Sequence, residues 1–262
     1  MLTVISPAKT LDFDTKPTTR KSTQPEFLER SAQLVEDARS MSPDDIRDLM
    51  GVSEKIADLN HQRFLNWGTP FDLDNAKQSI LAFKGDVYTG LEAETMDAKQ
   101  LNFAQKHLRI LSGLYGLLRP LDLMQPYRLE MGLKFANSGG KNLYAFWGDS
   151  LTQSLNAQLG RSGSRVLVNL ASNEYFKSLQ AKSIDADIVT PVFKDLKGDK
   201  YRVISFFAKK ARGQMARYII DQGLNQPDGL KKFRRDGYRY NKAESTAREL
   251  VFTRDKSPSA QA

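Results

Sequence analysis

The sequence contains no cysteine and only two histidines, His61 and His107. The absence of cysteine excludes disulfide bonds, thiol redox chemistry and cysteine-ligated zinc or iron–sulfur sites. A bound metal would need mostly carboxylate ligands, because both histidines fall in polar, helix-like stretches where surface positions are common. We therefore expect neither a metal site nor a cofactor.

Long apolar segments and common enzyme motifs are also missing. No apolar run approaches the roughly 20 residues that a membrane-spanning helix needs, and the first seven residues lack the basic and apolar regions of a signal peptide. The chain has no G-x-x-x-x-G-K-[ST], G-x-G-x-x-G, H-E-x-x-H or G-x-S-x-G motif. We expect a cytoplasmic monomer that does not bind membranes.

The order of the predicted elements indicates the fold class. Apolar, strand-like runs at 2–6, 79–83, 109–111, 129–135 and 165–170 alternate with helical patterns, and strands at 188–193 and 201–207 form a hairpin around Asp195–Asp199. This alternation favours an α/β or α+β fold, a mixed sheet with surrounding helices. The length of 262 residues suits a single globular domain at 1–254, followed by a polar, disordered tail at 255–262.

Positive charge is concentrated in the last 72 residues. From Pro191 onward there are 17 Lys and Arg against 8 Asp and Glu, a net of +9, whereas the first 190 residues carry 22 against 23, a net of −1. Such asymmetry favours a polyanionic partner, although a solvated basic surface is a common alternative. Within this region basic residues alternate with aromatics, a pattern that suits phosphates and stacked bases. The predicted phosphate-binding residues are Lys209, Lys210, Arg212, Arg217, Arg234 and Arg235.

Residues 42–67 predict two helices joined by a tight turn. Ser42-Pro43 is a strong helix start, and Gly51-Val52-Ser53 separates the helices. Backbone N–H groups at the start of the second helix suit a phosphate, and Lys55 adds charge nearby. The layout resembles a helix-hairpin-helix nucleic-acid motif, except that Ser53 replaces the usual second glycine. An ordinary helical hairpin is an equally good interpretation.

The stretch from 110 to 132 combines many leucines with glycines and prolines. The chain breakers forbid a long regular element, yet the leucines favour burial. Polar side chains must then satisfy the buried backbone. The stretch is either a structural crossover or the floor of a pocket, and we favour the pocket for its polar members. These are Arg119, Tyr127, Arg128 and Glu130.

Further polar residues directly follow strand-like runs, where α/β proteins present side chains to ligands. They are Lys9, Lys84, Asp86, Asn169 and Ser172. Because strand ends, chain breaks and helix starts offer side chains to shared cavities, we predict that five cations from these segments converge on a phosphate-bearing ligand. The five are Lys9, Arg119, Arg128, Lys209 and Arg212.

Several motifs together resemble the YaaA-like peroxide stress proteins, over essentially the whole chain. The matching segments are 5–11, 83–88, 111–131, 144–148, 169–175 and 206–217. The resemblance implies a cytosolic bacterial protein, induced by peroxide, that limits free iron and oxidative damage. It also implies a DNA-binding, single-domain fold of unusual topology, with a helix-hairpin-helix element and a positive cleft. It supplies no agreed reaction or catalytic residue.

Two functions remain open from the sequence. One is a stress protein that binds double-stranded or distorted DNA through the hairpin and the cleft. The other is an enzyme that acts on a nucleotide or another phosphorylated small molecule, with the cations as anion holders and Glu130 or Asp86 as base.

Overall fold

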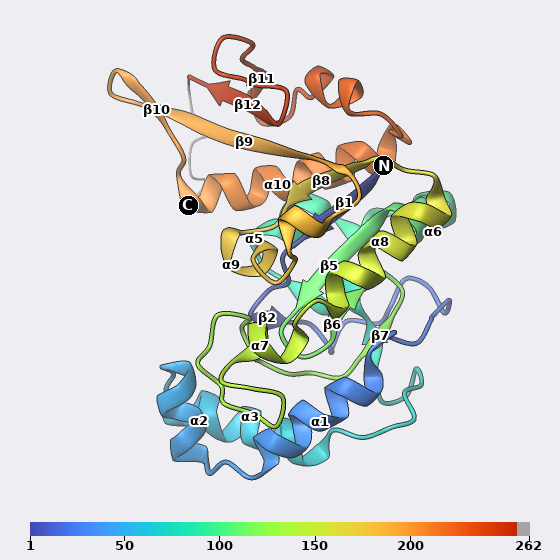
Figure 1. The fold of residues 1–262 in the computed structure, drawn as a ribbon, viewed down its shortest axis with the longest axis vertical. Helices are drawn as coiled ribbons and strands as arrows, with labels where there is room; N and C mark the ends of the chain where they lie inside the picture. Colours follow the sequence, from blue (N-terminus) through green and yellow to red (C-terminus); the bar gives the residue numbers. More distant parts are fainter. Residues whose placement is uncertain (256–262) are drawn as a thin grey trace.

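A mainly parallel sheet forms the centre of the structure, a computed structural model that describes residues 1–255 (Figure 1). The predicted tail at 255–262 lies outside the described residues except for Asp255. Among the described residues, the sheet has the strand order β11-β12-β9-β8-β1-β5-β6, with β10 added to β9. Its strands are β1 Leu2–Ile5, β5 Leu108–Ser112, β6 Gly116–Leu118, β8 Val166–Leu170, β9 Asp187–Lys197, β10 Lys200–Arg202, β11 Arg239–Tyr240 and β12 Glu249–Arg254. The predicted α/β class with a mixed sheet is confirmed.

Strand β1 lies in the middle of the sheet and is buried along its whole length. It pairs in parallel with β5, from Thr3↔Leu108 to Ile5↔Ile110, and with β8, from Leu2↔Leu167 to Ile5↔Leu170. A strand covered on both faces needs a continuous apolar run, which explains why 2–5 shows no alternation. Parallel pairing places the carboxyl ends of β1, β5 and β8 at one edge of the sheet.

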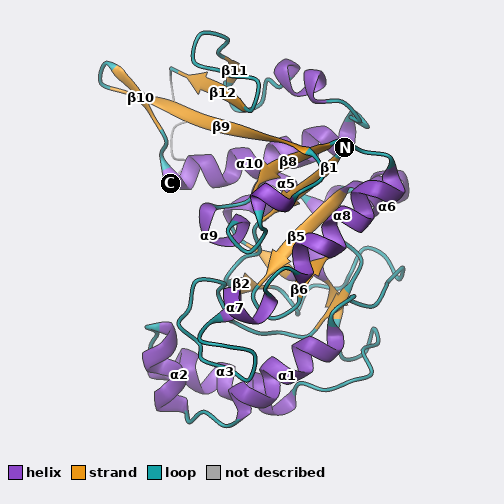
Figure 2. Cartoon of the chain, viewed as in Figure 1, coloured by secondary structure: helices purple, strands orange, loops and turns teal. Residues whose placement is uncertain are grey.

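Helices cover the sheet and build a mostly helical region beyond its β6 side (Figure 2). That region contains α1, α2 and α3, and their side chains join the same buried apolar cluster as the sheet. The helices are α1 Leu28–Arg39, α2 Pro43–Met50, α3 Glu54–Asn66, α4 Ser79–Ala82, α5 Asp86–Leu91, α6 Ala98–His107, α7 Leu143–Trp147, α8 Ser150–Ser162, α9 Asn173–Phe176 and α10 Ser205–Asp221. Short 3-10 turns span Ala93–Thr95, Ala181–Ser183 and Pro227–Lys232. Two small ladders pair β2 Thr10–Leu11 with β4 Phe83–Lys84, and β3 Lys77–Gln78 with β7 Leu123–Met124.

Two glycines allow α5 and α10 to pack with their backbones almost in contact. A Cβ atom at Gly213 would lie 1.8 Å from the carbonyl oxygen of Val87, and one at Gly90 would lie 2.1 Å from that of Lys210. Only glycine fits at both positions. The contact fixes α5, which begins at Asp86, against the half of α10 that carries Lys209 and Arg212.

The structure differs from the sequence-based expectation in three segments. Residues 79–82 form the single turn α4 rather than a strand, and Ser79 is held by hydrogen bonds to the carbonyls of Arg119 and Pro120. A short apolar run does not distinguish a strand from a buried helix. A possible strand at 129–135 is a loop, in which Gly132 donates to Glu174 rather than to a strand. The second hairpin strand is shorter than predicted, since α10 already begins at Ser205.

Candidate functional site

The loops that follow β1 and β8 meet at the carboxyl edge of the sheet. Ser172 N–H donates to Ser6 Oγ at 2.9 Å, and the two hydroxyl oxygens lie 3.3 Å apart. From this point β1 leads to β5 on one side, whereas β8 leads to β9 on the other. Where two adjacent parallel strands connect to opposite sides of an α/β sheet, a crevice opens at their carboxyl ends, and ligands commonly bind there.

A single carboxylate holds two cations at this edge. Glu130 Oε1 accepts from Lys9 Nζ at 3.0 Å and from Arg128 Nη2 at 3.0 Å and Nε at 3.1 Å. Glu130 is buried, whereas the Lys9 side chain is 65% exposed. The other carboxylate oxygen, Oε2, is buried and has no hydrogen-bond partner within residues 1–255. A buried oxygen without a protein partner is costly, so Oε2 is a candidate acceptor for a water molecule or a ligand.

Two buried tyrosines, Tyr127 and Tyr175, lie beside the carboxylate, and a third, Tyr88, lies near both of them. Tyr127 Oη shares a 2.6 Å hydrogen bond with Ser112 Oγ, and Tyr88 Oη donates to the carbonyl of Ser6 at 3.2 Å. Burial raises the pKa of Tyr88, Tyr127 and Tyr175 above the usual range, so the three phenols are neutral at physiological pH. The depression between Tyr127, Tyr175, Lys9 and Glu130 has about 10 Å³ of free volume, enough for about one water molecule. A phosphate-bearing ligand would therefore lie over the depression rather than inside it.

Strand pairing brings a second group of charges to the same edge. Thr10 pairs with Lys84, and a Cβ atom at Gly85 would lie 3.3 Å from that of Ala8, so this loop lies against the one after β1. Lys84 Nζ lies 3.7 Å from Asp12 Oδ2, and Lys209 Nζ lies 4.0 Å from Asp86 Oδ2.

Arg212 follows Lys209 by one helical turn and is half-buried. Burial lowers the pKa of its guanidinium, and it forms no ion pair or hydrogen bond with any residue between 1 and 255. A half-buried guanidinium needs partners for its five N–H donors. The described chain therefore leaves its N–H donors without partners.

We refer to this group as the strand-end site. It contains more positive than negative charges, five cations against three carboxylates. The members are Lys9, Lys84, Arg128, Lys209 and Arg212 with Asp12, Asp86 and Glu130. Asp12 in addition lies 3.6 Å from the buried Lys77, so the three carboxylates do not offset the charge of all the cations paired with them.

The other predicted residues of the cleft support its backbone. Asn169 is buried, and its Oδ1 accepts from Ala171 N–H at 3.0 Å. Ser172 is the first residue before α9 and contacts Ser6 as described above. Both shape the loop after β8 without presenting charge.

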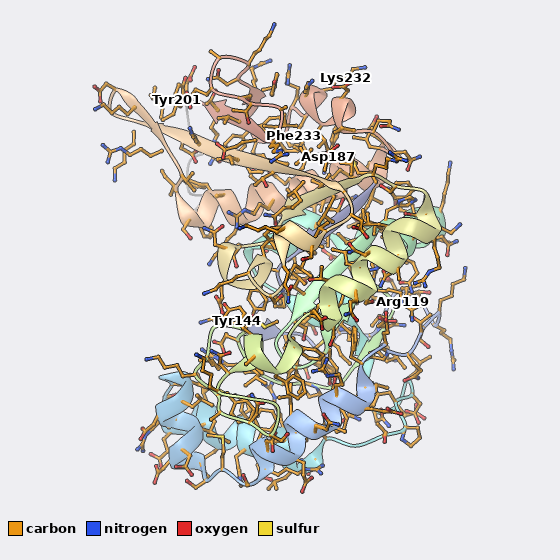
Figure 3. All side chains as sticks on the ribbon, viewed as in Figure 1. Arg119, Tyr144, Asp187, Tyr201, Lys232 and Phe233 are labelled. Atoms are coloured by element: carbon orange, nitrogen blue, oxygen red, sulfur yellow. The ribbon has the colours of Figure 1, made fainter. Side chains whose placement is uncertain are left out.

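The structure does not bring Arg119 to the strand-end site, and the predicted convergence of five cations is wrong for this residue. Strand β6 runs antiparallel to β5, so the end of β6 lies beside the start of β5, at the opposite edge of the sheet. Arg119 Nη2 binds Asp122 Oδ1 at 2.8 Å and the carbonyl of Gln24 at 2.9 Å. Figure 3 shows Arg119 and Tyr144 on opposite sides of the molecule, and Tyr144 bonds to the loop after β8 through the Glu174 carbonyl.

Most cations of the predicted basic face have structural partners. Lys210 lies 3.1 Å from Asp236, and Arg217 and Arg235 both bind Asp221, at 2.8 and 2.6 Å. Arg234 donates to the carbonyls of Lys231 and Phe233. Much of the C-terminal positive charge therefore stabilises the fold, which a count of charges cannot show.

The helices α2 and α3 form the predicted hairpin, joined by Gly51-Val52-Ser53. Gly51 adopts φ 60° and ψ 47°, and Ser42 and Asp45 form a capping box at the start of α2. Ser53 caps α3 only through its carbonyl, because its side chain makes no capping hydrogen bond. Residues 42–67 carry three cations and five carboxylates, a net charge of −2. Any phosphate contact here must therefore depend on backbone N–H groups and Lys55.

Within residues 1–255, no three His, Asp or Glu side chains gather in a group that could hold a metal ion. His61 lies on α3, whereas His107 ends α6. Over the same residues no helix combines the length and apolar character needed to cross a bilayer.

Sequence reasoning did not identify every residue at this edge. Ser6 links the two loops, and Tyr175 packs beside Glu130, yet neither was selected as a site residue. The signal was present for Ser6, which directly follows a buried strand. Tyr175 ends the segment 169–175, which carries the family resemblance, but only the folded chain places it near 127–130.

These features define a mixed α/β protein with a cationic site at the carboxyl ends of its parallel strands. The chain belongs to the family described as peroxide stress protein YaaA, whose family model matches residues 1–244. A UPF0246 protein from Cellvibrio japonicus (strain Ueda107) is 59% identical over 256 residues, which cover 98% of this chain and 99% of that protein. The resemblance inferred from the motifs is confirmed.

Proposed function

We propose that this peroxide stress protein binds DNA, with phosphates at the strand-end site and at the α2–α3 turn. The observation that supports this best is the surplus of positive charge at the strand-end site, where five cations face three carboxylates and Arg212 has no partner among the described residues. Phosphate contacts release counterions and supply most of the affinity for DNA. The turn adds backbone N–H groups, but its surroundings are acidic, so it positions the duplex rather than attracting it.

The test compares single substitutions that each remove one positive charge. Arg128→Ala and Arg212→Ala should each weaken binding of duplex DNA by about tenfold, since one charge-assisted contact contributes about 1.5–3 kcal/mol. Lys232→Ala is the control, because Lys232 is exposed and lies on the 3-10 turn after α10. The two arginine variants should also abolish peroxide protection in cells while remaining folded. Full affinity and full protection in both arginine variants would exclude the strand-end site.

Limitation of free iron is, in this proposal, an indirect effect. A selective transition-metal site rarely consists of carboxylates alone, and the two histidines lie on different helices. Calorimetry of the pure protein with ferrous iron should therefore show no tight stoichiometric binding. A stoichiometric, submicromolar binding isotherm would contradict the indirect mechanism.

A specific observation favours a second candidate, an enzyme acting on a phosphorylated small molecule. Plain phosphate binding does not need a buried carboxylate that has one oxygen without a protein partner and lies beside two neutral tyrosines, Tyr127 and Tyr175. In this alternative Glu130 or Asp86 is the base and the cations hold the phosphate. Salt separates the two candidates, because a duplex gives a steep salt dependence of affinity and a single small anion gives a shallow one.

A further inference from the structure

We propose that the amino-terminal edge of the sheet carries a second, independent site, which binds a mononucleotide-sized phosphate ester. The site is a cavity of about 540 Å³, within the size range of small-molecule pockets. Four cations border it, together with one carboxylate, two amides, a histidine and a serine. We call it the arginine pocket; its charged members are Lys106, Arg109, Arg119, Arg161 and Glu26, and Gln158 is the amide bonded to Arg109.

The fold brings these cations together from separate segments. Arg109 lies at the start of β5, and Arg119 follows the end of the antiparallel β6, so the two lie side by side. Lys106 is in the last turn of α6, and Arg161 is in the last turn of α8. The edge is the one opposite the strand-end site, because β6 runs antiparallel to β5 and therefore ends beside the start of β5.

Arg109 is the buried anchor of the pocket. The residue is only 6% exposed, and its Nε donates to Gln158 Oε1, while Nη1 donates to the carbonyls of Gln105 and Leu108. Its remaining nitrogen, Nη2, makes no hydrogen bond with any residue of the described chain and is not fully enclosed by protein. A buried guanidinium held in place on two of its nitrogens presents the third to the cavity as a fixed donor.

Charge within the pocket is not balanced by the protein. The four cations face two carboxylates, Glu26 and Asp122, and the carboxyl ends of α6 and α8 add about half a negative charge each. About one positive charge remains. Burial is the largest cause that lowers the pKa of Arg109 to about 10, and repulsion from Arg119 is the second. An anion in the pocket would raise this pKa again.

The depth and size of the pocket determine the class of ligand. Arg109 is too deeply buried to reach the backbone of a rigid duplex, whereas the phosphate of a small molecule can enter the cavity. Inorganic phosphate alone would leave most of the volume unfilled. Glu26 and Gln158 offer oxygen acceptors for hydroxyl or amino groups, so an organic phosphate ester uses the pocket more fully than the free ion.

Calorimetry of the full chain with AMP and with inorganic phosphate tests this proposal. AMP should bind, and more tightly than phosphate. Arg161→Gln should weaken AMP binding by about tenfold, because an arginine–phosphate contact is charge-assisted and often bidentate. Arg161 is exposed and makes no ion pair or hydrogen bond within residues 1–255, so the variant should fold. Arg165→Gln is the control, an exposed arginine four residues further on that does not border the cavity.

Three results would overturn the proposal. The first is no binding of AMP at millimolar concentration, and the second is equal affinity for AMP and inorganic phosphate. The third is loss of AMP binding in Arg128→Gln but not in Arg161→Gln, which would assign the ligand to the strand-end site. The outcome does not depend on whether the protein binds DNA.

Discussion

The two edges of the sheet carry similar charges in different settings. At the carboxyl edge, Lys9 is 65% exposed and Glu130 has a depression with room for about one water molecule. At the amino edge, Arg109 is 6% exposed within a cavity of about 540 Å³. An exposed cationic surface suits an extended polyanion, whereas a recessed one suits a small anion. The comparison shows that accessibility, rather than the number of cations, separates the two proposed ligands.

The largest expected effect comes from disturbing the packing of α5 against α10, which positions Asp86 and Lys209 at the carboxyl edge. Gly213→Ala would place a methyl group 1.8 Å from the Val87 carbonyl oxygen, so α5 and α10 must separate. We expect a loss of about 3 kcal/mol in the free energy of unfolding, measured by urea denaturation, together with reduced DNA binding. Gly160→Ala on α8 is the control, because a Cβ atom there meets nothing within 4 Å. It should be neutral or stabilise by up to about 1 kcal/mol. Similar stability of both variants would contradict the close packing.

A second substitution separates the hairpin from the carboxyl edge. Gly51 has φ +60°, so Gly51→Val should cost about 1–2 kcal/mol locally, distort the turn and weaken DNA binding about tenfold while the fold persists. Gly51→Asn is the matched control, because asparagine tolerates this conformation. Unchanged affinity in folded Gly51→Val would show that the turn does not contact DNA, and the carboxyl edge would then act alone.

Removing the Glu130 carboxylate should strengthen DNA binding at the strand-end site without changing the arginine pocket. Glu130→Gln frees Lys9 and Arg128 from their shared partner, so affinity for DNA should rise several-fold, equivalent to about 1 kcal/mol. Affinity for AMP at the opposite edge should not change. Reduced DNA affinity in a folded variant would show that Glu130 itself contacts DNA, which would contradict its role as a partner that competes for Lys9 and Arg128.

The smallest effect concerns acid stability near the same edge. Hydrogen bonds from Thr15 lower the pKa of Asp12 to about 2 from the usual 3.8. Because the folded pKa is the lower one, Asp12 stabilises the fold above pH 3.8, and this contribution is lost as the pH falls through 2. Asp12→Asn should therefore reduce stability at neutral pH by about 1 kcal/mol, and its urea midpoint should converge with that of the wild type near pH 2. The exposed Asp14→Asn is the control, and parallel pH profiles for the wild type and Asp12→Asn would be inconsistent with this role.

Local signals in the sequence predicted much of the fold. The capping residues Ser42 and Asp45 fixed the start of α2, and unbroken apolar runs marked β1 and β8. The location of a residue at the carboxyl edge was predictable where that residue follows a strand closely, as for Lys9. The location of a residue was not predictable where it depends on the pairing of segments that are far apart in the sequence. Arg119 sits at the amino edge because β6 turns back along β5, and Arg109 and Arg161 meet only in the folded chain.

The salt dependence of DNA affinity tests the central claim most directly. We compare the wild type with Arg212→Gln and Arg161→Gln, each of which removes one arginine that has no partner among the described residues, from opposite edges of the sheet. Loss of one phosphate contact should reduce the slope of log affinity against log salt by about 0.9. We predict that reduction for Arg212→Gln and an unchanged slope for Arg161→Gln. Equal slopes for all three proteins, or a reduction only in Arg161→Gln, would contradict DNA binding at the carboxyl edge.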